Sequence, residues 1–409
     1  MKKPKIRFKG FTETWEQRKL FDFTYFYNGL TYTPDDVREN GTLVLRSSNV
    51  KHSEIVLNDN VYVDPIKVNS EYVKKGDIII VVRNGSRALI GKHAVIKDEM
   101  PNTVIGAFMS GIRSQYSFFV NSLLDTSQFK EEILRNLGAT INQITGYMFS
   151  KMEFMIPSCY EQKIIGDYFS KLDNLITLHQ RKCENLKKLK KFMLQKMFPQ
   201  NGENVPKIRF YNFTDTWEQR KLEDFGVATG GTSIESEFIE DGKYKVISIG
   251  SYSECSKYVD QGIRTEKTPK TKNRILNKND LAMILNDKTS SGKIIGRVLL
   301  IDADDAYVYN QRTERIEVNH NCYVSEFLYH LLNADNIRAK IIRTAQGNTQ
   351  IYVNWNVIKN FTYDIPINIC EQIVIGDCFS KLDDLITLHQ SKCDNLKELK
   401  KYMLQNMFI

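Results

Sequence analysis

The feature of this sequence that most restricts its fold is an internal repeat in two parts. Residues Ile6–Leu20 (IRFKGFTETWEQRKL) return as Ile208–Leu222 (IRFYNFTDTWEQRKL), with identity at 12 of 15 positions. Residues Glu161–Phe198 return as Glu371–Phe408, with identity at 29 of 38 positions. The stretches that these segments enclose show no comparable match. The chain therefore uses one scaffold twice, around two unlike inserts.

The repeated segments 161–198 and 371–408 are predicted to form long helices. No Gly or Pro lies between Asp167 and Phe198, and Pro199 ends the pattern. At about 1.5 Å per residue, the 38 residues give a rod of roughly 57 Å. Apolar residues recur along the first segment in steps of three and four, at Ile165, Phe169, Leu172, Ile176, Cys183, Leu186, Met193 and Met197.

We expect the two helices to pair as an antiparallel coiled coil, because each must return the chain beside the other half. Two unrelated surface helices, each packed on its own domain, are the alternative. The residues expected to form the helix pair or to dock other subunits are Leu172, Ile176, His179, Cys183, Leu186, Leu382, Ile386, His389, Cys393 and Leu396.

The inserts share a weak outline of strands and helices. Gly76-Asp77 precedes the apolar run IIIVV as Asn279-Asp280 precedes LAMIL, and a polar, Gly-containing turn follows each run. Helices are predicted at Ser122–Leu137 and Ser325–Ile342, and a last strand leads into Pro157 or Pro366. The expected fold class is mixed α/β, with two globular domains, two long helices and a pseudo-two-fold repeat. The predicted division is a domain at 1–158, a helix at 159–200, a domain at 201–368 and a helix at 369–409.

Composition sets limits on the compartment and the partners. The chain has 57 basic and 49 acidic residues, a net charge of +8, which is weak support for a polyanionic partner. The charge is uneven, at +5 over residues 161–198 and −1 over 371–409. Seven cysteines without a CxxC pair argue against a disulfide framework or a zinc site. No apolar run approaches the roughly 18 residues of a membrane span, and the basic N-terminus lacks a signal-peptide core, so we expect a cytoplasmic protein.

A scaffold that is kept twice while its inserts vary holds two different recognition modules at a fixed separation. Double-stranded DNA is the partner that most naturally requires this, because two half-sites must lie at a defined spacing and rotational phase. A rod of about 57 Å corresponds to roughly one and a half turns of duplex at 34–36 Å per turn. Unlike inserts indicate an asymmetric, two-part target with an unread spacer.

Two motifs carry a resemblance to a known family. TWEQRKL after IRFxxFT, and EQxxIGDxFSKLDxLITLHQ after an Ile-Pro strand end, resemble the specificity subunits of type I restriction-modification enzymes over essentially the whole chain. The resemblance implies two target-recognition domains and two conserved helices that also dock two modification subunits. It implies that these partners methylate adenine with S-adenosylmethionine, and that a motor-nuclease subunit using ATP and Mg²⁺ can join them. This chain itself is expected to bind no cofactor or metal and to carry no catalytic site.

Polar loop residues of the inserts are the candidates for DNA contact. Arg and Lys suit guanine O6 and N7, Asn and Gln suit adenine N6 and N7, and all can instead hold phosphates or remain solvated. In the first insert the candidates are Arg46, Ser47, Ser48, Asn49, Arg83, Asn84, Ser86, Arg87, Asn142 and Gln143. In the second they are Asn286, Lys288, Ser290, Lys293, Asn310, Gln311, Arg312, Gln346, Asn348 and Gln350.

Some of these loops also resemble recognition-domain signatures of the family. Asn310–Arg315 (NQRTER) and Gly347–Gln350 (GNTQ) do so, whereas Gly138–Gln143 (GATINQ) departs from GNTQ. Outside the loops, Trp15 and Trp217 are expected to pack their strand onto a core rather than stack on bases. The lysines of the helix surface can contact spacer phosphates, dock a partner or remain solvated; they are Lys187, Lys188, Lys190 and Lys191.

Other functions lack their motifs. The chain has no Pro-Pro pair and no GxGxxG, which argues against a methyltransferase, and Gly292-Lys293 lacks the remainder of a P-loop. Asp384 and Glu398 lie about four helical turns apart, too far to share a metal ion. Two alternatives stay open: a coiled-coil spacer that presents two protein-binding modules, and a transcription regulator that binds DNA without methyltransferase partners.

Overall fold

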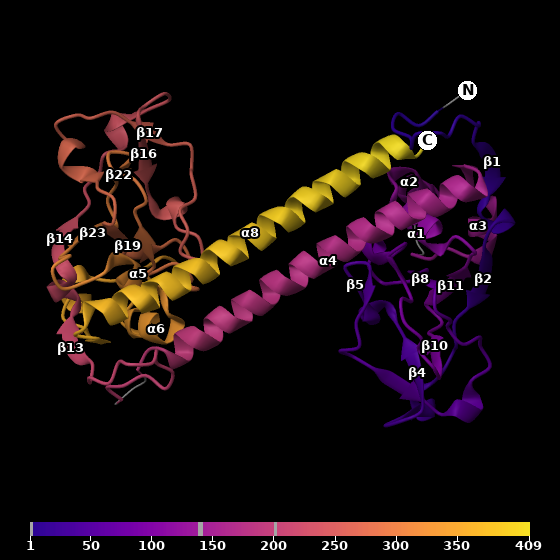
Figure 1. Ribbon diagram of the computed structural model, residues 1–409, viewed down its shortest axis with the longest axis horizontal. Helices are drawn as coiled ribbons and strands as arrows, with labels where there is room; N and C mark the ends of the chain where they lie inside the picture. Colours follow the sequence, from indigo (N-terminus) through magenta and orange to yellow (C-terminus); the bar gives the residue numbers. More distant parts are fainter. Residues whose placement is uncertain (1–2, 138–141, 200–202) are drawn as a thin grey trace. The chain divides into compact units, whose positions relative to one another are not determined.

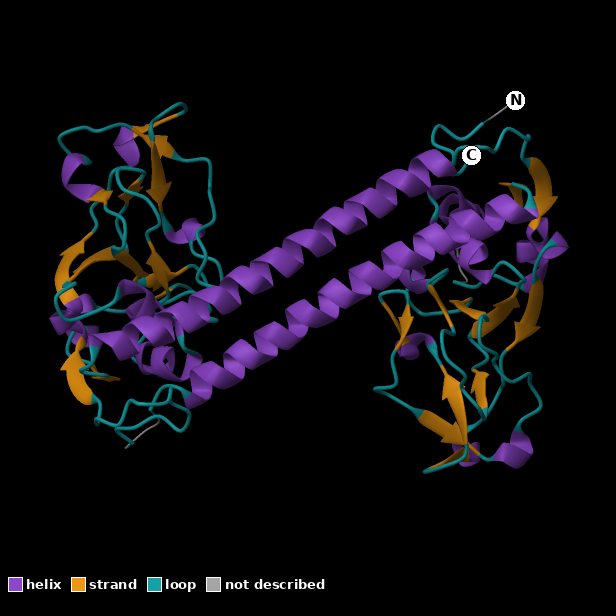
Figure 2. Cartoon of the chain, in the orientation of Figure 1, coloured by secondary structure: helices purple, strands orange, loops and turns teal. Residues whose placement is uncertain are grey.

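The computed structural model of the chain describes residues 3–137, 142–199 and 203–409 (Figure 1). Its contacts divide the chain into two compact units: a first unit of Met1–Gln180 with Gln390–Ile409, and a second unit of Arg181–His389. Helices α4 (Cys159–Lys196) and α8 (Ile369–Met407) each contribute a segment to both units. The β-rich part of each unit therefore packs against segments of both long helices (Figure 2).

The first unit contains two principal sheets. Strands β2, β11, β8 and β9 form an antiparallel sheet in that order, and β10, β4, β7 and β3 form the other, in which β10 and β4 are parallel. Strand β1 pairs with β12 and β5 pairs with β6. The strands are β1 Glu16–Lys19, β2 Tyr25–Asn28, β3 Val37–Arg38, β4 Thr42–Leu45, β5 Val50–Lys51, β6 Glu54–Ile55, β7 Val61–Val63, β8 Ile78–Val81, β9 His93–Val95, β10 Thr103–Ile105, β11 Met109–Arg113 and β12 Glu153–Ile156. The shorter helices are α1 Ser117–Asp125, α2 Ser127–Asn136 and α3 Gly146–Lys151.

The second unit repeats this plan. Strands β14, β23, β19 and β21 form the antiparallel sheet, and β15, β17, β16, β22 and β18 form the other. Strand β13 pairs with β25 and β20 pairs with β24. The strands are β13 Glu218–Lys221, β14 Gly226–Gly230, β15 Phe238–Ile239, β16 Tyr244–Ile247, β17 Arg264–Thr265, β18 Ile275–Leu276, β19 Leu281–Ile284, β20 Asn286–Asp287, β21 Val298–Leu300, β22 Tyr307–Tyr309, β23 Thr313–Val318, β24 Ile351–Tyr352 and β25 Thr362–Ile365. The shorter helices are α5 Ser325–Asn333, α6 Asp335–Arg343 and α7 Trp355–Ile358.

An Asp residue precedes the central strand of the antiparallel sheet in both inserts, which accounts for the similarity between them that the sequence shows. Asp77 and Asp280 each accept a hydrogen bond from the backbone N–H three residues earlier, at 2.9 and 2.7 Å. The residue before each Asp has a left-handed backbone, with φ of +91° at Gly76 and +70° at Asn279, which Gly and Asn tolerate best. The signature therefore builds a tight turn into the central strand of each sheet.

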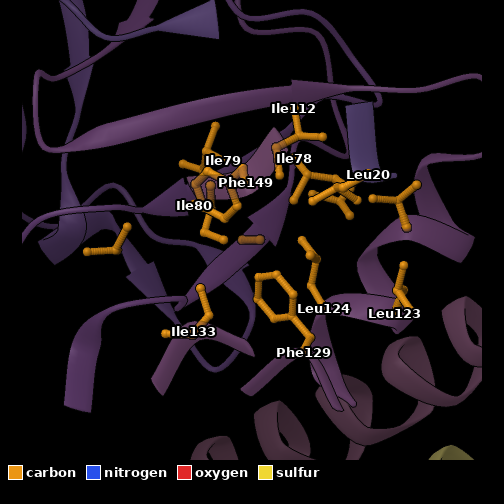
Figure 3. Packing of buried hydrophobic residues seen from close by; sticks show 14 of the residues in the cluster. Leu20, Ile78, Ile79, Ile80, Ile112, Leu123, Leu124, Phe129, Ile133 and Phe149 are labelled. Carbon is orange, nitrogen blue, oxygen red and sulfur yellow. The ribbon is translucent and has the colours of Figure 1, made fainter. Parts of the chain in front are cut away.

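Strand β8 lies at the centre of the first core. Its residues are all buried, as expected of a continuous apolar run that is covered on both faces. Figure 3 shows Ile78, Ile79 and Ile80 of this strand among side chains of α1 and α2, including Leu124 and Phe129. The sheet is thus fixed to the helices that follow it in sequence.

The predicted helices at 122–137 and 325–342 are each two helices, which corrects the sequence analysis. Thr126 has an extended backbone, and its hydroxyl caps α2 by accepting a hydrogen bond from Phe129 N–H at 3.2 Å. In the second unit Ala334 makes the same break through its extended backbone, and its methyl side chain cannot cap α6. The apolar pattern continues through both breaks, so periodicity alone could not show them.

The long helices run antiparallel within each unit. In the first unit the rings of Phe169 and Phe408 lie 6.0 Å apart and Asp173 pairs with Lys400 at 2.6 Å. In the second unit the corresponding pairs are Phe379 with Phe198, at 5.8 Å between ring centres, and Asp383 with Lys190, at 2.6 Å. Higher numbers in α4 meet lower numbers in α8 in both cases. The predicted fold class, with its helix pair and two-fold repeat, is confirmed.

The conserved N-terminal motif of each repeat anchors the start of a long helix. Arg7 donates two hydrogen bonds of 2.7 Å to Glu161, and Arg209 donates bonds of 2.7 and 2.8 Å to Glu371. Trp15 and Trp217 are 5% and 3% exposed, so both pack inside cores as predicted. Among the described residues, no helix combines the length and the apolar character needed to cross a membrane.

Candidate nucleic-acid interface

Three loops that are far apart in the first insert meet at one end of the sheet β2-β11-β8-β9. The Asn84 amide donates to the Ser47 hydroxyl at 3.3 Å, and Arg83 forms an isolated β-bridge with Gln143. The Asn84 N–H donates to the Asn142 carbonyl, also at 3.3 Å. The loops after β4 and β8 and the segment before α3 are therefore neighbours, as required if their predicted residues contact one ligand.

A cavity of about 580 Å³ opens beside these loops. Arg46 lines it and is held by Asp59, with Nη2 to Oδ2 at 2.8 Å, while Arg46 Nε is buried and forms no hydrogen bond with a described residue. Phe108 is 55% exposed on the rim, and the guanidinium of Arg83 lies 5.1 Å from its ring centre. The full lining is Leu30, Thr31, Tyr32, Arg46, Ser47, Ser48, Asp59 and Gly106–Met109. Tyr32, Asp59 and Phe108 were not among the predicted residues, because only the folded loops bring them together.

Two predicted contact residues of the first insert have other tasks. Asn49 is fully buried, and its side chain accepts from Arg46 N–H and donates to the Val56 carbonyl. It shapes the loop, and its prediction as a DNA-contacting residue is corrected. Arg87 is exposed and donates to the Leu137 carbonyl at 3.2 Å, while Ser48 and Ser86 are exposed.

The second insert brings its loops together at the corresponding end of the sheet β14-β23-β19-β21. Asn286 pairs with Tyr352 across β20 and β24, and Gln346 exchanges backbone hydrogen bonds of 2.9 Å with Tyr352. The Leu285 N–H donates to the Arg312 carbonyl at 2.8 Å. Asn348 and Gln350 are exposed in the same loop. Lys288 and Ser290 are exposed, and Lys293 pairs with Glu254 at 2.8 Å.

The loop Asn310–Arg312 is hydrogen-bonded at its base and exposed at its tip. Asn310 is 6% exposed and, like Gln311, donates to Glu235 at 2.9 Å. Hydrogen bonds from the Ser233 hydroxyl and then the Asn310 amide lower the pKa of Glu235 to about 2. Arg312 is exposed, has a left-handed backbone with φ of +74°, and makes no ion pair or hydrogen bond through its side chain to a described residue. Asn310 is thus structural, while Arg312 is available to a ligand.

Backbone hydrogen bonds fix how the two inserts correspond. Ile144 N–H donates to the Val82 carbonyl as Val353 N–H donates to the Leu285 carbonyl. Gln143 therefore corresponds to Tyr352, and the residues equivalent to Gly347–Gln350 are 138–141, which lie outside the described residues. By the same criterion Phe108 corresponds to Arg312. The Phe108 carbonyl accepts hydrogen bonds from the N–H groups of Val82 and Arg83, and the Arg312 carbonyl accepts one from Leu285 N–H.

The predicted helix-pair residues are buried or half-buried on α4 and α8. Leu172, Ile176, Cys183, Leu382 and Cys393 are buried, and the Cys183 thiol donates to the Ile386 carbonyl at 3.8 Å. The remaining predicted positions are half-buried: His179, Leu186, Ile386, His389 and Leu396.

Lys190 corrects the expectation for the lysine cluster. It is ion-paired with Asp383, and burial lowers the pKa of its ammonium group despite that partner. Its repeat equivalent Lys400 pairs with both Asp125 and Asp173 at 2.6 Å. Lys190 is therefore a residue of the helix interface, whereas Lys187, Lys188 and Lys191 remain exposed.

Each unit also exposes an apolar stripe on its helix segments. In the first unit it consists of Leu175, Leu178, Leu399 and Tyr402, with 41–55% of each residue exposed. In the second unit it consists of Leu385, Leu388, Leu189 and Phe192, with 43–48% exposed. On α4, Thr177 bonds Glu54 of the globular part. At about 100° per residue, Leu178 lies roughly 100° and Leu175 roughly 160° around the helix from Thr177, so both point away from that contact. We call these two sets the first and second helix stripes.

Comparison with known proteins decides the family. The sequence model described as "Type I restriction modification DNA specificity domain" matches residues 12–188 and, a second time, residues 214–398. The chain belongs to this family. The resemblance found in the repeated motifs is thereby confirmed, and each match covers one repeat of scaffold, insert and helix.

Relatives of this specificity-subunit family align over most of the chain. The specificity subunit of the type I restriction enzyme MjaVIII from Methanocaldococcus jannaschii is 24% identical over 367 residues, covering 85% of this chain and 82% of the relative. The StySPI specificity subunit from Salmonella potsdam is 20% identical over 371 residues, covering 87% and 79%. The crystal structure of the type I S subunit from M. genitalium has the same fold, with a TM-score of 0.68, 14% identity and coverage of 100% and 99%.

The described residues contain no group of three or more His, Cys, Asp or Glu side chains placed to hold a metal ion. The polar groups at the loop ends include amides, hydroxyls and guanidinium groups. Such groups form hydrogen bonds with base edges and phosphates.

Proposed function

We propose that this specificity subunit recognises an asymmetric, bipartite DNA target, with one half-site bound by each globular domain. The observation that carries the proposal is that equivalent ends of two homologous sheets present unlike side chains. The residue at the tip of the loop before β11 is Phe108 in the first domain. The corresponding residue, at the tip of the loop before β23, is Arg312 in the second domain. The two domains would therefore bind different bases.

The chemistry of the two tips supports different half-sites. An exposed Phe makes apolar contact with a thymine methyl group, whereas Arg donates two hydrogen bonds to guanine O6 and N7. Arg46 and Arg83 add positive charge beside Phe108 and suit phosphates or guanine. We propose residues 1–158 and 201–368 as the recognition domains, and residues 159–200 and 369–409 as the helices that fix the spacer between the half-sites.

The two helix stripes are proposed to dock two copies of a modification subunit. The four members of one stripe have repeat equivalents in the other, as Leu175 has in Leu385. Two like surfaces suit two copies of the same partner. Successive stripe positions on a helix lie three residues apart, as at Leu175 and Leu178, which is the spacing that packs against apolar helices. The partner surface is therefore expected to be helical and apolar.

The chemistry of the assembly is assigned to its partners. Modification subunits would supply S-adenosylmethionine-dependent adenine methylation, and a motor-nuclease subunit would supply ATP- and Mg²⁺-dependent cleavage. This chain would contribute sequence recognition, spacing and docking, and would act in the cytoplasm where the DNA is.

The test is co-expression of the chain with its modification subunit, followed by single-molecule sequencing of host DNA for methylated adenine. A two-part asymmetric motif that depends on this chain is the expected result. Phe108→Ala and Arg312→Ala should then each relax one half-site, and not the same one. A stable complex that gives no motif would contradict DNA recognition, and the absence of both complex and motif would favour the protein-interaction alternative.

A further inference from the structure

A buried acidic residue lies just behind the recognition loop of the second domain. Glu314 is 6% exposed in β23, between Gly230 of β14 and Met283 of β19. Its carboxylate forms no hydrogen bond or ion pair with a described residue. It extends over the bare backbone of Gly230, since a Cβ atom there would lie 3.3 Å from Oε2. Burial raises the pKa of Glu314 to about 7, against the opposing effect of the nearby Arg274 cation.

The first domain shows that the fold does not require this carboxylate. The turns at Asp77 and Asp280 align the central strands, so Ile80 corresponds to Met283. Ser110 is paired with Ile80 as Glu314 is paired with Met283. The Ser110 hydroxyl donates to the Tyr27 carbonyl at 3.2 Å and needs no further partner. A small neutral side chain therefore satisfies the same position of the same sheet.

The surroundings of Glu314 place it at the candidate DNA-binding end of the sheet. Thr313 alone separates it from Arg312, the exposed tip of the recognition loop. Strand β14 ends at Gly230, and beyond it Thr232 accepts a hydrogen bond from Arg274 Nε at 3.4 Å. Arg274 also donates to the Tyr309 hydroxyl at 3.3 Å, so its guanidinium is held near Glu314 without pairing with it.

The chemistry of a carboxylate restricts what can bind there. An ionised carboxylate only accepts hydrogen bonds, and a buried one without a donor is costly. The ionised form also repels phosphates, which disfavours a contact with the DNA backbone. In the grooves of DNA the donors that suit a carboxylate are exocyclic amino groups, above all N4 of cytosine and also N6 of adenine.

We propose that Glu314 is a specificity-determining residue of the second recognition domain and accepts a hydrogen bond from the exocyclic amino group of a base in its half-site. The inference rests on the proposed function, since it assigns a residue to one position of the bipartite target. Arg274 would lie beside the same base pair and donate hydrogen bonds to acceptor atoms on the edge of a base.

The first experiment compares methylation motifs made by the full complex with the wild-type chain, Glu314→Gln and Glu314→Ser. We expect one position of one half-site to change from a single base to several bases in Glu314→Ser, with the other half-site unchanged. Ser110→Ala, at the equivalent position of the first domain, is the matched control and should leave the whole motif intact. Unchanged motifs in both Glu314 variants would overturn the proposal, whereas a wild-type complex without any bipartite motif would overturn the proposed function itself.

The second experiment identifies the base and remains informative if Glu314→Ser folds poorly. Duplexes carry 2-pyrimidinone in place of cytosine or purine in place of adenine, which removes only the amino group. We expect about a 10-fold loss of affinity for the wild-type complex at one such position. The same replacement should cause little loss for Glu314→Leu, whose side chain has no oxygen to accept the hydrogen bond. Equal losses for the wild type and Glu314→Leu at every position would refute the contact.

Discussion

The pairs Arg7–Glu161 and Arg209–Glu371 offer a sharp test of what fixes the globular parts to the long helices. Replacing Arg7 with Met keeps most of the side-chain volume but leaves Glu161 buried without its cation. The Glu161 side chain is 1% exposed and receives both hydrogen bonds from Arg7. Removing one partner of a buried pair typically costs about 3–5 kcal/mol.

Two features of the structure refine that magnitude. Glu161 lies in the first turn of α4, where the helix dipole stabilises an unpaired carboxylate by up to about 1 kcal/mol, so we expect Arg7→Met to cost about 3 kcal/mol. Glu371 also accepts a hydrogen bond from Trp217 Nε1 at 3.3 Å, whereas Trp15 Nε1 has no hydrogen-bond partner among the residues that the structure describes. Arg209→Met should therefore cost roughly 1 kcal/mol less than Arg7→Met.

Thermal unfolding followed by hydrogen exchange of individual peptides measures both effects. A cost of about 3 kcal/mol corresponds to a fall in Tm of roughly 6–12 °C for a unit of this size. Peptides of the first unit should lose protection in Arg7→Met, and peptides of the second unit in Arg209→Met. The control is Arg18→Met, because Arg18 pairs with Glu16 at the surface and its loss should be undetectable. Equal unfolding temperatures for Arg7→Met and Arg18→Met would refute the reasoning.

Three further predictions concern buried charge and docking. Lys400→Met should destabilise more than Lys190→Met, because Lys400 pairs with two carboxylates, Asp125 and Asp173, whereas Lys190 pairs only with Asp383 among the described residues. Denaturant midpoints should show the difference shrinking as the pH falls and the carboxylates take up protons. Glu314→Gln should stabilise the second unit by about 2 kcal/mol at pH 8 and have little effect at pH 5. The reason is that a carboxyl whose pKa is about 7 in the folded state destabilises that state only once the pH rises above the pKa of the same carboxyl in the unfolded state. Equal changes in the free energy of unfolding at both pH values would contradict this. Leu178→Asp in the first helix stripe should reduce the bound modification subunits from two to one by mass photometry, whereas Lys191→Asp should retain two.

Much of the architecture follows from local patterns in the sequence. The three- and four-residue spacing from Ile165 to Met197 predicts α4, and the identity with the second copy predicts α8. Lys190 shows where such reasoning fails. It occupies an interface position seven residues after the buried Cys183, so its spacing indicated an interface residue, but its charge suggested the surface until the structure showed Asp383 beside it.

The recognition residues are harder to derive because loops decide their neighbours. Arg46 and Asn84 carry polar side chains of the expected kind, but the cavity also depends on Tyr32, Asp59 and Phe108. The position of Glu314 within its strand was nevertheless a signal in the sequence. It alternates with Ile316 and Val318 along one face of a strand, and a charged residue in such a buried row requires a reason.

The backbone contacts that follow each long helix have a consequence for chain connectivity. Ile208 N–H donates to the Lys196 carbonyl at 2.9 Å, and Ile6 N–H donates to the Asn406 carbonyl at 3.0 Å. The first contact closes a short segment of continuous chain, while the second joins residues 400 positions apart in the same geometry. The order of the packed elements is therefore circular, and the two contacts mark equivalent positions at which the chain can be open or continuous. Opening the chain near residue 203 and joining its present ends should therefore preserve every packing contact and alter only the order in which the pieces are synthesised.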